Sequence, residues 1–156
     1  MVFHVVALPH TEVTKEFVSC AYTQKVLNFC KMMFERGHTV YLYAVGDRTE
    51  APCTEFVSLY TTEMRKTFFP DNGIQSADQI KYDTKLPYWI VFNDTAAAEI
   101  NKRKHDLNDF VCIIYGMCHE PVMAQTQPLR CVEFGIGYAG VIPKAFHVFE
   151  STCWRN

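Results

Sequence analysis

Short apolar runs in this sequence alternate with longer stretches in which apolar residues recur every three or four positions. Residues 3–8 are almost continuously apolar and too few for a helix that buries one face, so we expect a buried strand there. Residues 20–36 carry one apolar stripe at helical spacing, and Gly37 follows as a stop signal. Residues 39–45 are β-branched and aromatic, as in a strand. This order predicts a βαβ unit with two parallel strands.

The second half of the chain continues the alternation. Residues 86–104 contain YWIVF, which alone is typical of a strand, but a proline in the first turn, three consecutive alanines and a basic C-terminal run favour a helix. Residues 109–115 are then a buried strand that ends at Gly116. The remaining expected elements are a strand at 55–60, a long polar loop at 61–84, a short helix at 121–127, a last strand at 130–134 and a closing helix at 144–154.

The order of these elements predicts an α/β fold, a Rossmann-like three-layer sandwich with a mostly parallel sheet flanked by helices. The length of 156 residues suits one domain, so we assign residues 1–156 to a single Rossmann-like domain with 3–8 as a central strand. Ligands of such sheets bind outside the carboxyl ends of the strands. The residues that directly follow each strand are therefore the candidate site.

Composition narrows the function classes. The chain is 49% hydrophobic and 21% charged with a formal net charge of -2, so it has neither the basic surface of a nucleic-acid binder nor an apolar run long enough for a membrane span. We expect a soluble protein of the cytoplasm, or of the host cytoplasm if the protein is viral. The seven cysteines are odd in number and contain no CxxC pair, which favours reduced thiols. We expect neither a metal site nor a cofactor.

The first strand ends in Pro9, His10 and Thr11, which form the first candidate ligand wall. His10 is the candidate catalytic base, because an imidazole titrates near neutral pH. The alternative is a loop histidine that caps a neighbouring helix. Thr14 and Lys15 could bind a sugar or a phosphate, although a solvated polar loop explains them equally well.

Thr23 and Gln24 lie in the first turn of the first predicted helix, where free backbone N–H groups attract anions. Plain helix capping is the alternative. At the second strand exit, Gly116 and His119 are candidates to line the ligand cleft.

The third strand exit supplies Glu133, Gly135, Gly137 and Tyr138. Glu133 could accept hydrogen bonds from sugar hydroxyls, and Tyr138 could stack on a ring. The glycines lack the spacing of a phosphate-binding Walker loop, so they could equally serve only to turn the backbone. No glycine fingerprint follows the first strand, and for this reason we interpret Asp47 as a turn residue and expect no NAD site.

Blocks of sequence along nearly the whole chain resemble a family of glycosyltransferase-like proteins with the GT-B architecture, which is frequent in viruses and bacteria. In order these blocks are LPHT, TKEF, CAYTQKVLNFCKMM, GHTVYLY, FNDTAAAEI, DFVCIIYG and VEFGIGYAG, followed by VFES and a tryptophan. GT-B proteins place two Rossmann-like domains face to face, the first mainly for the acceptor and the second for the nucleotide-sugar donor. The chain resembles the N-terminal half, with the donor half absent.

The resemblance implies a glycosyltransferase-like domain that handles a glycan acceptor and a nucleotide sugar in an inter-domain cleft, with little or no activity without a donor-binding half. Several inverting members hold a general-base histidine after the first strand, which supports His10. The implied partners are the nucleotide sugar or another nucleotide, the glycan acceptor, and a second Rossmann-like domain or another copy of the chain. The alternative is a stand-alone, non-catalytic protein that binds or sequesters a nucleotide or sugar nucleotide.

Overall fold

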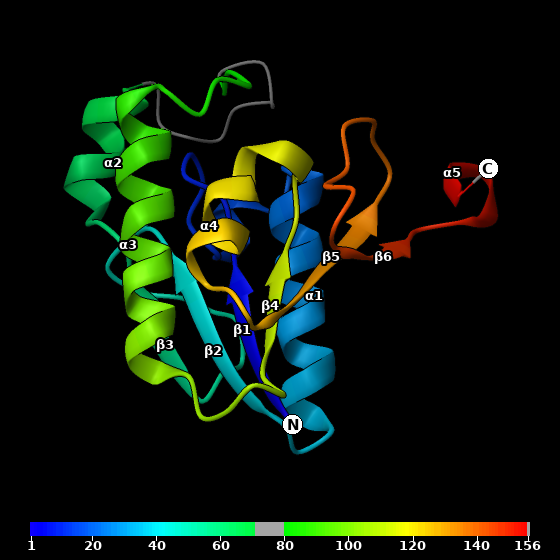
Figure 1. The fold of residues 1–156 in the computed structure, drawn as a ribbon. Coiled ribbons are helices and arrows are strands. Elements are labelled where there is room, and N and C mark those ends of the chain that lie inside the picture. Colours follow the sequence, from blue (N-terminus) through cyan, green and yellow to red (C-terminus); the bar gives the residue numbers. More distant parts are fainter. Residues whose placement is uncertain (71–79, 156) are drawn as a thin grey trace.

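The computed structural model describes residues 1–70 and 80–155 (Figure 1). Six strands form one all-parallel sheet in the order β3-β2-β1-β4-β5-β6. The strands are β1 Val2–Val6, β2 Thr39–Ala44, β3 Glu55–Ser58, β4 Phe110–Ile113, β5 Arg130–Ile136 and β6 Phe146–Phe149. The helices are α1 Ala21–Glu35, α2 Thr62–Phe68, α3 Pro87–Arg103, α4 Glu120–Gln125 and α5 Thr152–Arg155, and 3₁₀ turns lie at Lys15–Phe17 and Gly116–His119.

Strand β1 lies inside the sheet, between β2 and β4, which confirms the prediction of a central first strand. The chain moves outward from β1 through β2 to β3 and then returns to β4, on the other side of β1. This is the strand order of doubly wound dinucleotide-binding folds. The reversal between β1 and β4 is the switch point at which such sheets bind ligands.

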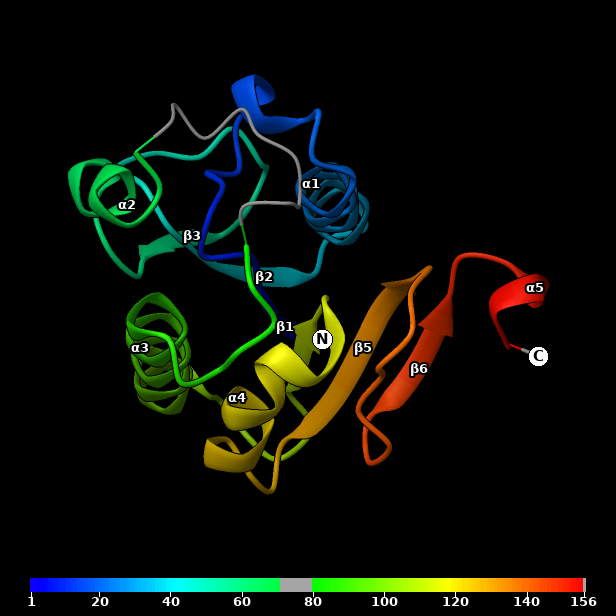
Figure 2. The ribbon, with the colours of Figure 1, turned by 90° about the horizontal axis from the view of Figure 1, so that it is seen from above.

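Helices cover both faces of the sheet, as the predicted three-layer arrangement requires (Figure 2). On one face, Val26 and Cys30 of α1 pack with Val5 of β1 in one buried cluster. On the other face, α3 and α4 supply the covering side chains. Because both faces are covered, the inner strands read as continuous apolar runs instead of alternating ones.

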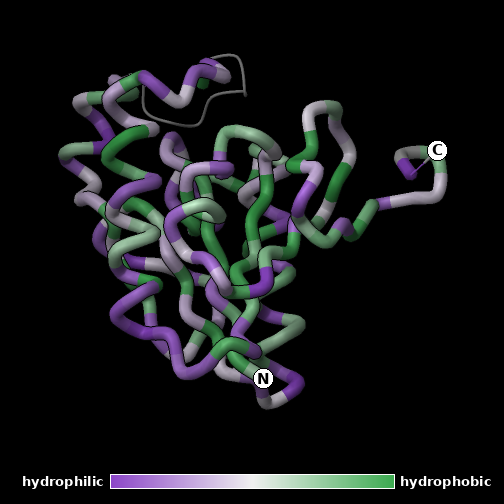
Figure 3. Tube along the Cα trace, viewed as in Figure 1, coloured by the Kyte–Doolittle hydropathy of each residue, from purple (hydrophilic) through white to green (hydrophobic). Residues whose placement is uncertain are grey.

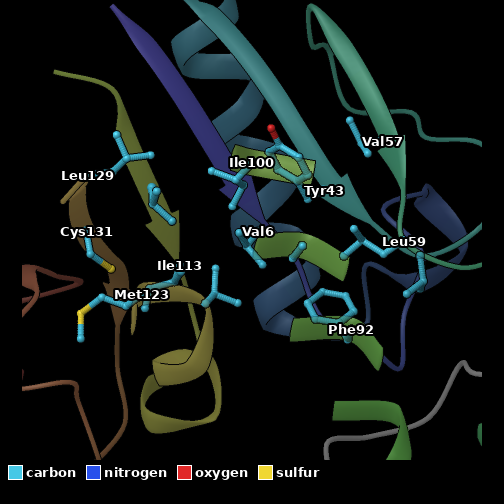
Figure 4. Close-up of a cluster of buried hydrophobic side chains, with 14 of the residues drawn as sticks. Val6, Tyr43, Val57, Leu59, Phe92, Ile100, Ile113, Met123, Leu129 and Cys131 are labelled. Atoms are coloured by element: carbon cyan, nitrogen blue, oxygen red, sulfur yellow. The ribbon is translucent and has the colours of Figure 1, made fainter. Parts of the chain in front are cut away.

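The core under α3 shows how the helical stripe meets the sheet (Figure 4). Val6 of β1 and Tyr43 of β2 lie in one cluster with Phe92 and Ile100 of α3, and Ile113 of β4 completes it. The most hydrophobic segments of the trace run through the middle of the molecule (Figure 3). The stripe that favoured a helix over a strand at 86–104 is buried, which confirms that prediction; its members are Trp89, Phe92, Asn93, Ala96, Ala97 and Ile100.

The expectation of a structureless loop at 61–84 is wrong in its first part, because α2 occupies Thr62–Phe68. Thr61 caps this helix, and its hydroxyl accepts a hydrogen bond from the backbone N–H of Met64 at 3.1 Å. Glu63 in the first turn and basic residues in the last turn suit the helix dipole. Positions 71–79 of the expected loop lie outside the described residues.

The prediction of a closing helix at 144–154 is also wrong, because β6 Phe146–Phe149 pairs with β5 and only Thr152–Arg155 is helical. An edge strand exposes much of its surface, and none of the four residues of β6 is fully buried. The segment therefore lacks the buried apolar run by which the inner strands are recognised. Strand β5 also runs further than expected, through Gly135, whose φ of 62° falls where the pairing with β6 is irregular.

Within the part of the chain that the structure describes, no helix combines the length and the apolar character that crossing a bilayer requires.

Candidate aromatic pocket

A cavity of about 660 Å³ lies at the carboxyl edge of the sheet. Tyr22 reaches it from the first turn of α1, Tyr115 from just beyond β4, and Tyr138 from just beyond β5. Tyr82 and Asp83 enter from the segment before α3, and Glu120 begins α4. The other lining residues are Thr84, Met117, Cys118, Pro121, Ala139 and Gly140. The cavity therefore lies beside the β1/β4 switch point, where this fold places ligands.

The backbone at the end of β4 takes a conformation that most residues avoid. Tyr115 has a φ of 89°, in the left-handed region, although it is not a glycine. Gly116 follows with a φ of 64°, and a Cβ there would lie 2.3 Å from the carbonyl oxygen of Gly140. Such strained positions cluster at ligand sites, because the surrounding structure must hold them in place.

The tyrosine rings of the pocket contact one another. Tyr82 stacks on Tyr115 with ring centroids 4.9 Å apart and planes 11° from parallel. Tyr22 meets Tyr115 edge-to-face at 4.8 Å and meets Tyr138 at 5.8 Å. Tyr115 is 3% exposed, and Tyr82 is 69% exposed. The cluster thus runs from the buried floor of the pocket to an outer ring that solvent reaches.

A buried carboxylate fixes one wall of the pocket. The hydroxyl of Tyr138 donates to Glu133 Oε1 at 2.6 Å and accepts from the backbone N–H of Tyr115 at 2.8 Å. Glu133 Oε2 accepts from the backbone N–H of Ile142 at 2.8 Å. Burial, followed by the neighbouring Glu133 carboxylate, raises the pKa of Tyr138. One carboxylate therefore joins the β4 exit, the β5 exit and the loop above them.

The hydroxyl of Tyr115 is buried, and apart from the neighbouring Tyr82 it has no hydrogen-bond partner within the described residues. Burial, with Tyr82 alongside, raises the pKa of this hydroxyl, so it stays protonated at neutral pH.

Cys118 lines the same pocket but is a poor nucleophile. Burial, with Asp83 nearby, raises its pKa to about 11, so the thiol is protonated at neutral pH. The arrangement favours binding over covalent chemistry.

His10, the predicted base, lies outside the lining of this pocket. Its ring is 3% exposed, and its Nε2 lies 3.8 Å from the Sγ of Cys20. Burial, followed by the positive charge of Arg65, lowers the pKa of His10 to about 4. The imidazole is neutral at pH 7, as a general base must be, but it packs against Phe69 and Cys20.

The other predicted residues of the first exit serve the packing of the loop. The carbonyl of Pro9 accepts a hydrogen bond from the hydroxyl of Tyr60. The hydroxyls of Thr11 and Thr23 lie 2.6 Å apart and are buried, which ties the exit of β1 to α1. Gln24, one residue further along α1, is exposed.

Thr14 and Lys15 also lie outside the lining of the aromatic pocket. Thr14 is buried beside the 3₁₀ turn Lys15–Phe17. The backbone N–H of Lys15 donates to Glu50 Oε2 at 2.7 Å, and its side chain faces solvent.

Among the later candidates, Gly116, Glu133 and Tyr138 come together around the pocket wall. His119 is fully buried beneath it, with its Nδ1 3.1 Å from Asn93 Oδ1, and burial lowers its pKa to about 3. The last two candidates, Gly135 and Gly137, lie in and just after β5.

Sequence reasoning missed most of the aromatic wall. Tyr22 belongs to the apolar stripe of residues 20–36, a pattern typical of core packing, while Tyr82 and Asp83 fall in the stretch expected to be a loop. Tyr115 was placed inside a strand. The available signal was the recurrence of a tyrosine at the strand exits, at Tyr115 and Tyr138.

A second hollow of about 500 Å³ lies near the exits of β1 and β2 and is lined mainly by charged side chains. Arg65 pairs there with Glu12 at 3.1 Å, and Arg48 pairs with Glu16 at 3.3 Å. Because these charges neutralise each other, the hollow favours neither an anion nor a cation. Among the described residues, no group of three or more His, Cys, Asp or Glu side chains is placed to hold a metal ion.

Comparisons with protein-family models, with curated proteins and with solved structures find no match for this chain.

Proposed function

We propose that this chain is the acceptor-side Rossmann-like half of a glycosyltransferase-like protein of GT-B architecture, and that its aromatic pocket binds a sugar ring of the acceptor. The observation that carries the proposal is the combination of four tyrosines and two carboxylates in one cavity beside the switch point. One face of a pyranose presents C–H groups that pack on an aromatic ring, and its hydroxyls donate to carboxylates.

The proposed function is binding, with the chemical step left to a cleft that includes a donor-holding domain. His10 is neutral at pH 7, but it is not among the residues that line the pocket, and its buried ring packs against Cys20 and Phe69. For His10 to act as a base in transfer, its surroundings must open.

The second candidate function is binding of a nucleotide or sugar nucleotide without catalysis. The stacked pair Tyr82 and Tyr115 favours it, because parallel aromatic planes also suit a nucleobase. Against it stands the charge of the lining, whose only charged side chains among the described residues are Asp83 and Glu120. A diphosphate beside two carboxylates is repelled unless cations compensate.

The test is ligand binding by the purified chain, measured by saturation-transfer NMR and calorimetry with glucose, galactose, lactose, uridine and uridine diphosphate. We expect the neutral sugars to bind with a Kd on the order of millimolar and uridine diphosphate to bind more weakly. Tyr138→Ala should abolish sugar binding, whereas Phe146→Ala, an exposed aromatic on the edge strand, should leave it unchanged. Binding of uridine diphosphate without any sugar would replace the first candidate by the second.

A further inference from the structure

The aromatic pocket has an unbalanced charge. Its only charged lining side chains among the described residues are the carboxylates Asp83 and Glu120. Lys25 lies beside the rings, with its Nζ 5.2 Å from the centroid of Tyr22. That ammonium is already engaged, because it lies 2.5 Å from Glu150 Oε1 and donates to the carbonyl of Gly135 at 3.1 Å.

The two carboxylates retain the capacity to accept further hydrogen bonds. Asp83 Oδ1 accepts from the backbone N–H of Lys85 at 3.0 Å, which leaves its second oxygen available within the described residues. The side chain of Glu120 has no hydrogen-bond or ion-pair partner within the described residues, and it is partly buried. Both groups line the cavity, so a donor that enters it finds two negative acceptors.

The aromatic rings add to the same preference. The face of a tyrosine is the negative side of its quadrupole and attracts a cation within about 6 Å of the centroid. Tyr22, Tyr82 and Tyr138 line the cavity around the buried Tyr115. The left-handed backbone at Tyr115 and Gly116, where the carbonyl of Gly140 leaves no room for a Cβ, is an independent feature of the same cavity that is typical of ligand sites.

From this charge distribution we propose that the pocket selects a ring that bears an ammonium group, such as an amino sugar in its protonated form, over the neutral and anionic forms of the same ring. The inference rests on the proposed function of the pocket as a sugar site and names the class of sugar. The carboxylates accept from the ammonium N–H groups, and the tyrosine faces contact its positive charge.

The experiment compares glucosamine, glucose, N-acetylglucosamine and glucose 6-phosphate on the purified chain by calorimetry and NMR titration at neutral pH. Glucosamine should bind about five- to tenfold more tightly than glucose, and glucose 6-phosphate should bind more weakly than either. The advantage of glucosamine should shrink when the salt concentration rises, because exposed charges are screened.

The double variant Asp83→Asn/Glu120→Gln removes both charges and keeps hydrogen-bonding oxygens. We expect it to bind glucosamine and glucose equally and to keep the wild-type Kd for glucose within about twofold. The matched control is Glu16→Gln/Glu35→Gln, which removes the same net charge from two exposed side chains outside the pocket. This control should keep the preference for glucosamine.

The outcomes separate the two proposals. Equal binding of glucose and glucosamine by the wild-type chain would overturn the ammonium preference and leave the sugar site standing. Failure of every sugar to bind would overturn both. Because Glu120 begins α4, circular dichroism must show that the double variant is folded; if it is not, Asp83→Asn alone, at an exposed position, tests the same preference with about half the effect.

Discussion

Two buried networks of a tyrosine and a carboxylate lie in this sheet, and they differ in what they face. In the first, His4 Nδ1 lies 2.8 Å from the hydroxyl of Tyr43, and His4 Nε2 lies 3.1 Å from Asp109 Oδ2. Asp109 Oδ2 also accepts from the backbone N–H of His105 at 2.6 Å. We call these residues the closed network, because the described protein groups satisfy one another.

The second network, which we call the open network, consists of Glu133, Tyr138 and the backbone of Tyr115. It also joins a tyrosine to a carboxylate, but it borders a cavity that Tyr115 and Tyr138 line. A satisfied network stabilises the fold. A network that holds strained backbone at the edge of a cavity is typical of a ligand site. We therefore expect substitutions in the closed network to lower stability and substitutions in the open network to weaken the proposed binding.

The largest expected change in the free energy of unfolding comes from lowering the pH, which should destabilise the whole fold. Burial lowers the pKa of His4, of His10 to about 4 and of His119 to about 3, from the ordinary 6.5. The unfolded chain therefore takes up protons first as the pH falls below 6.5, so stability is complete above that pH and is lost below it. Between pH 7.5 and 5.5 the free energy of unfolding should fall by about 3–4 kcal/mol, because each buried imidazole contributes roughly 1.4 kcal/mol over that range.

Urea unfolding followed by tryptophan fluorescence at pH 7.5, 6.5 and 5.5 measures this loss. A His119→Gln variant should show a shallower dependence on pH, because one buried imidazole no longer has to remain neutral. A free energy of unfolding that stays constant over this range would mean that water reaches the histidines in solution. The closed network around His4 would then not be closed.

The next largest effect should come from the closed network. Asp109→Ala leaves His4 Nε2 and the backbone N–H of His105 without their acceptor in the interior, which should lower the free energy of unfolding by about 2–4 kcal/mol. Sugar binding by the folded variant should be unchanged. Asp94→Ala, an exposed aspartate on α3, is the control and should change stability by less than about 0.5 kcal/mol. Weakened binding in Asp109→Ala would show that the two networks are coupled.

The sheet of this protein could be predicted because its inner strands are buried on both faces and carry continuous apolar runs. The stripe of α3 could be predicted because all six of its apolar-pattern positions are buried. The edge strand β6 could not, since Phe146 and Val148 face solvent and only the pairing with β5 makes the segment a strand. Local pattern carries no information on that pairing.

The site was predictable only in part, for a similar reason. Tyr138 and Gly116 follow strands, so the rule that ligands bind at strand exits finds them. Tyr82 belongs to a segment without regular structure, and a side-chain contact holds that segment beside the pocket. In this contact the indole N–H of Trp89 donates to the carbonyl of Lys81 at 2.7 Å. His10 follows a strand as well, but the packing of Cys20 and Phe69 buries it.

A pair of matched substitutions separates the networks more finely. Tyr43→Phe and Tyr138→Phe each remove one hydrogen-bonded hydroxyl, buried in Tyr43 and partly buried in Tyr138, and keep the ring, so each should lower the free energy of unfolding by about 1–2 kcal/mol. Only Tyr138→Phe should weaken sugar binding, by roughly three- to tenfold, because the backbone of Tyr115 and the carboxylate of Glu133 lose their common partner.

Chemical unfolding and calorimetry on the same two proteins give both quantities. The comparison fails if Tyr43→Phe weakens binding as much as Tyr138→Phe does. The comparison is strengthened if Glu133→Gln reproduces the binding defect of Tyr138→Phe. Glu133 accepts one hydrogen bond at each oxygen, from Tyr138 and from Ile142, and an amide has only one oxygen, so glutamine loses one of the two bonds.

The smallest expected effect on stability belongs to the outer ring of the pocket. Tyr82 is 69% exposed and stacks on Tyr115, so Tyr82→Ala should change the free energy of unfolding by less than about 0.5 kcal/mol. Its effect on sugar binding should still be a loss of about three- to tenfold, because the ring covers one side of the cavity. Phe146→Ala, at 65% exposure on β6, removes a similar exposed ring outside the pocket and should alter neither quantity.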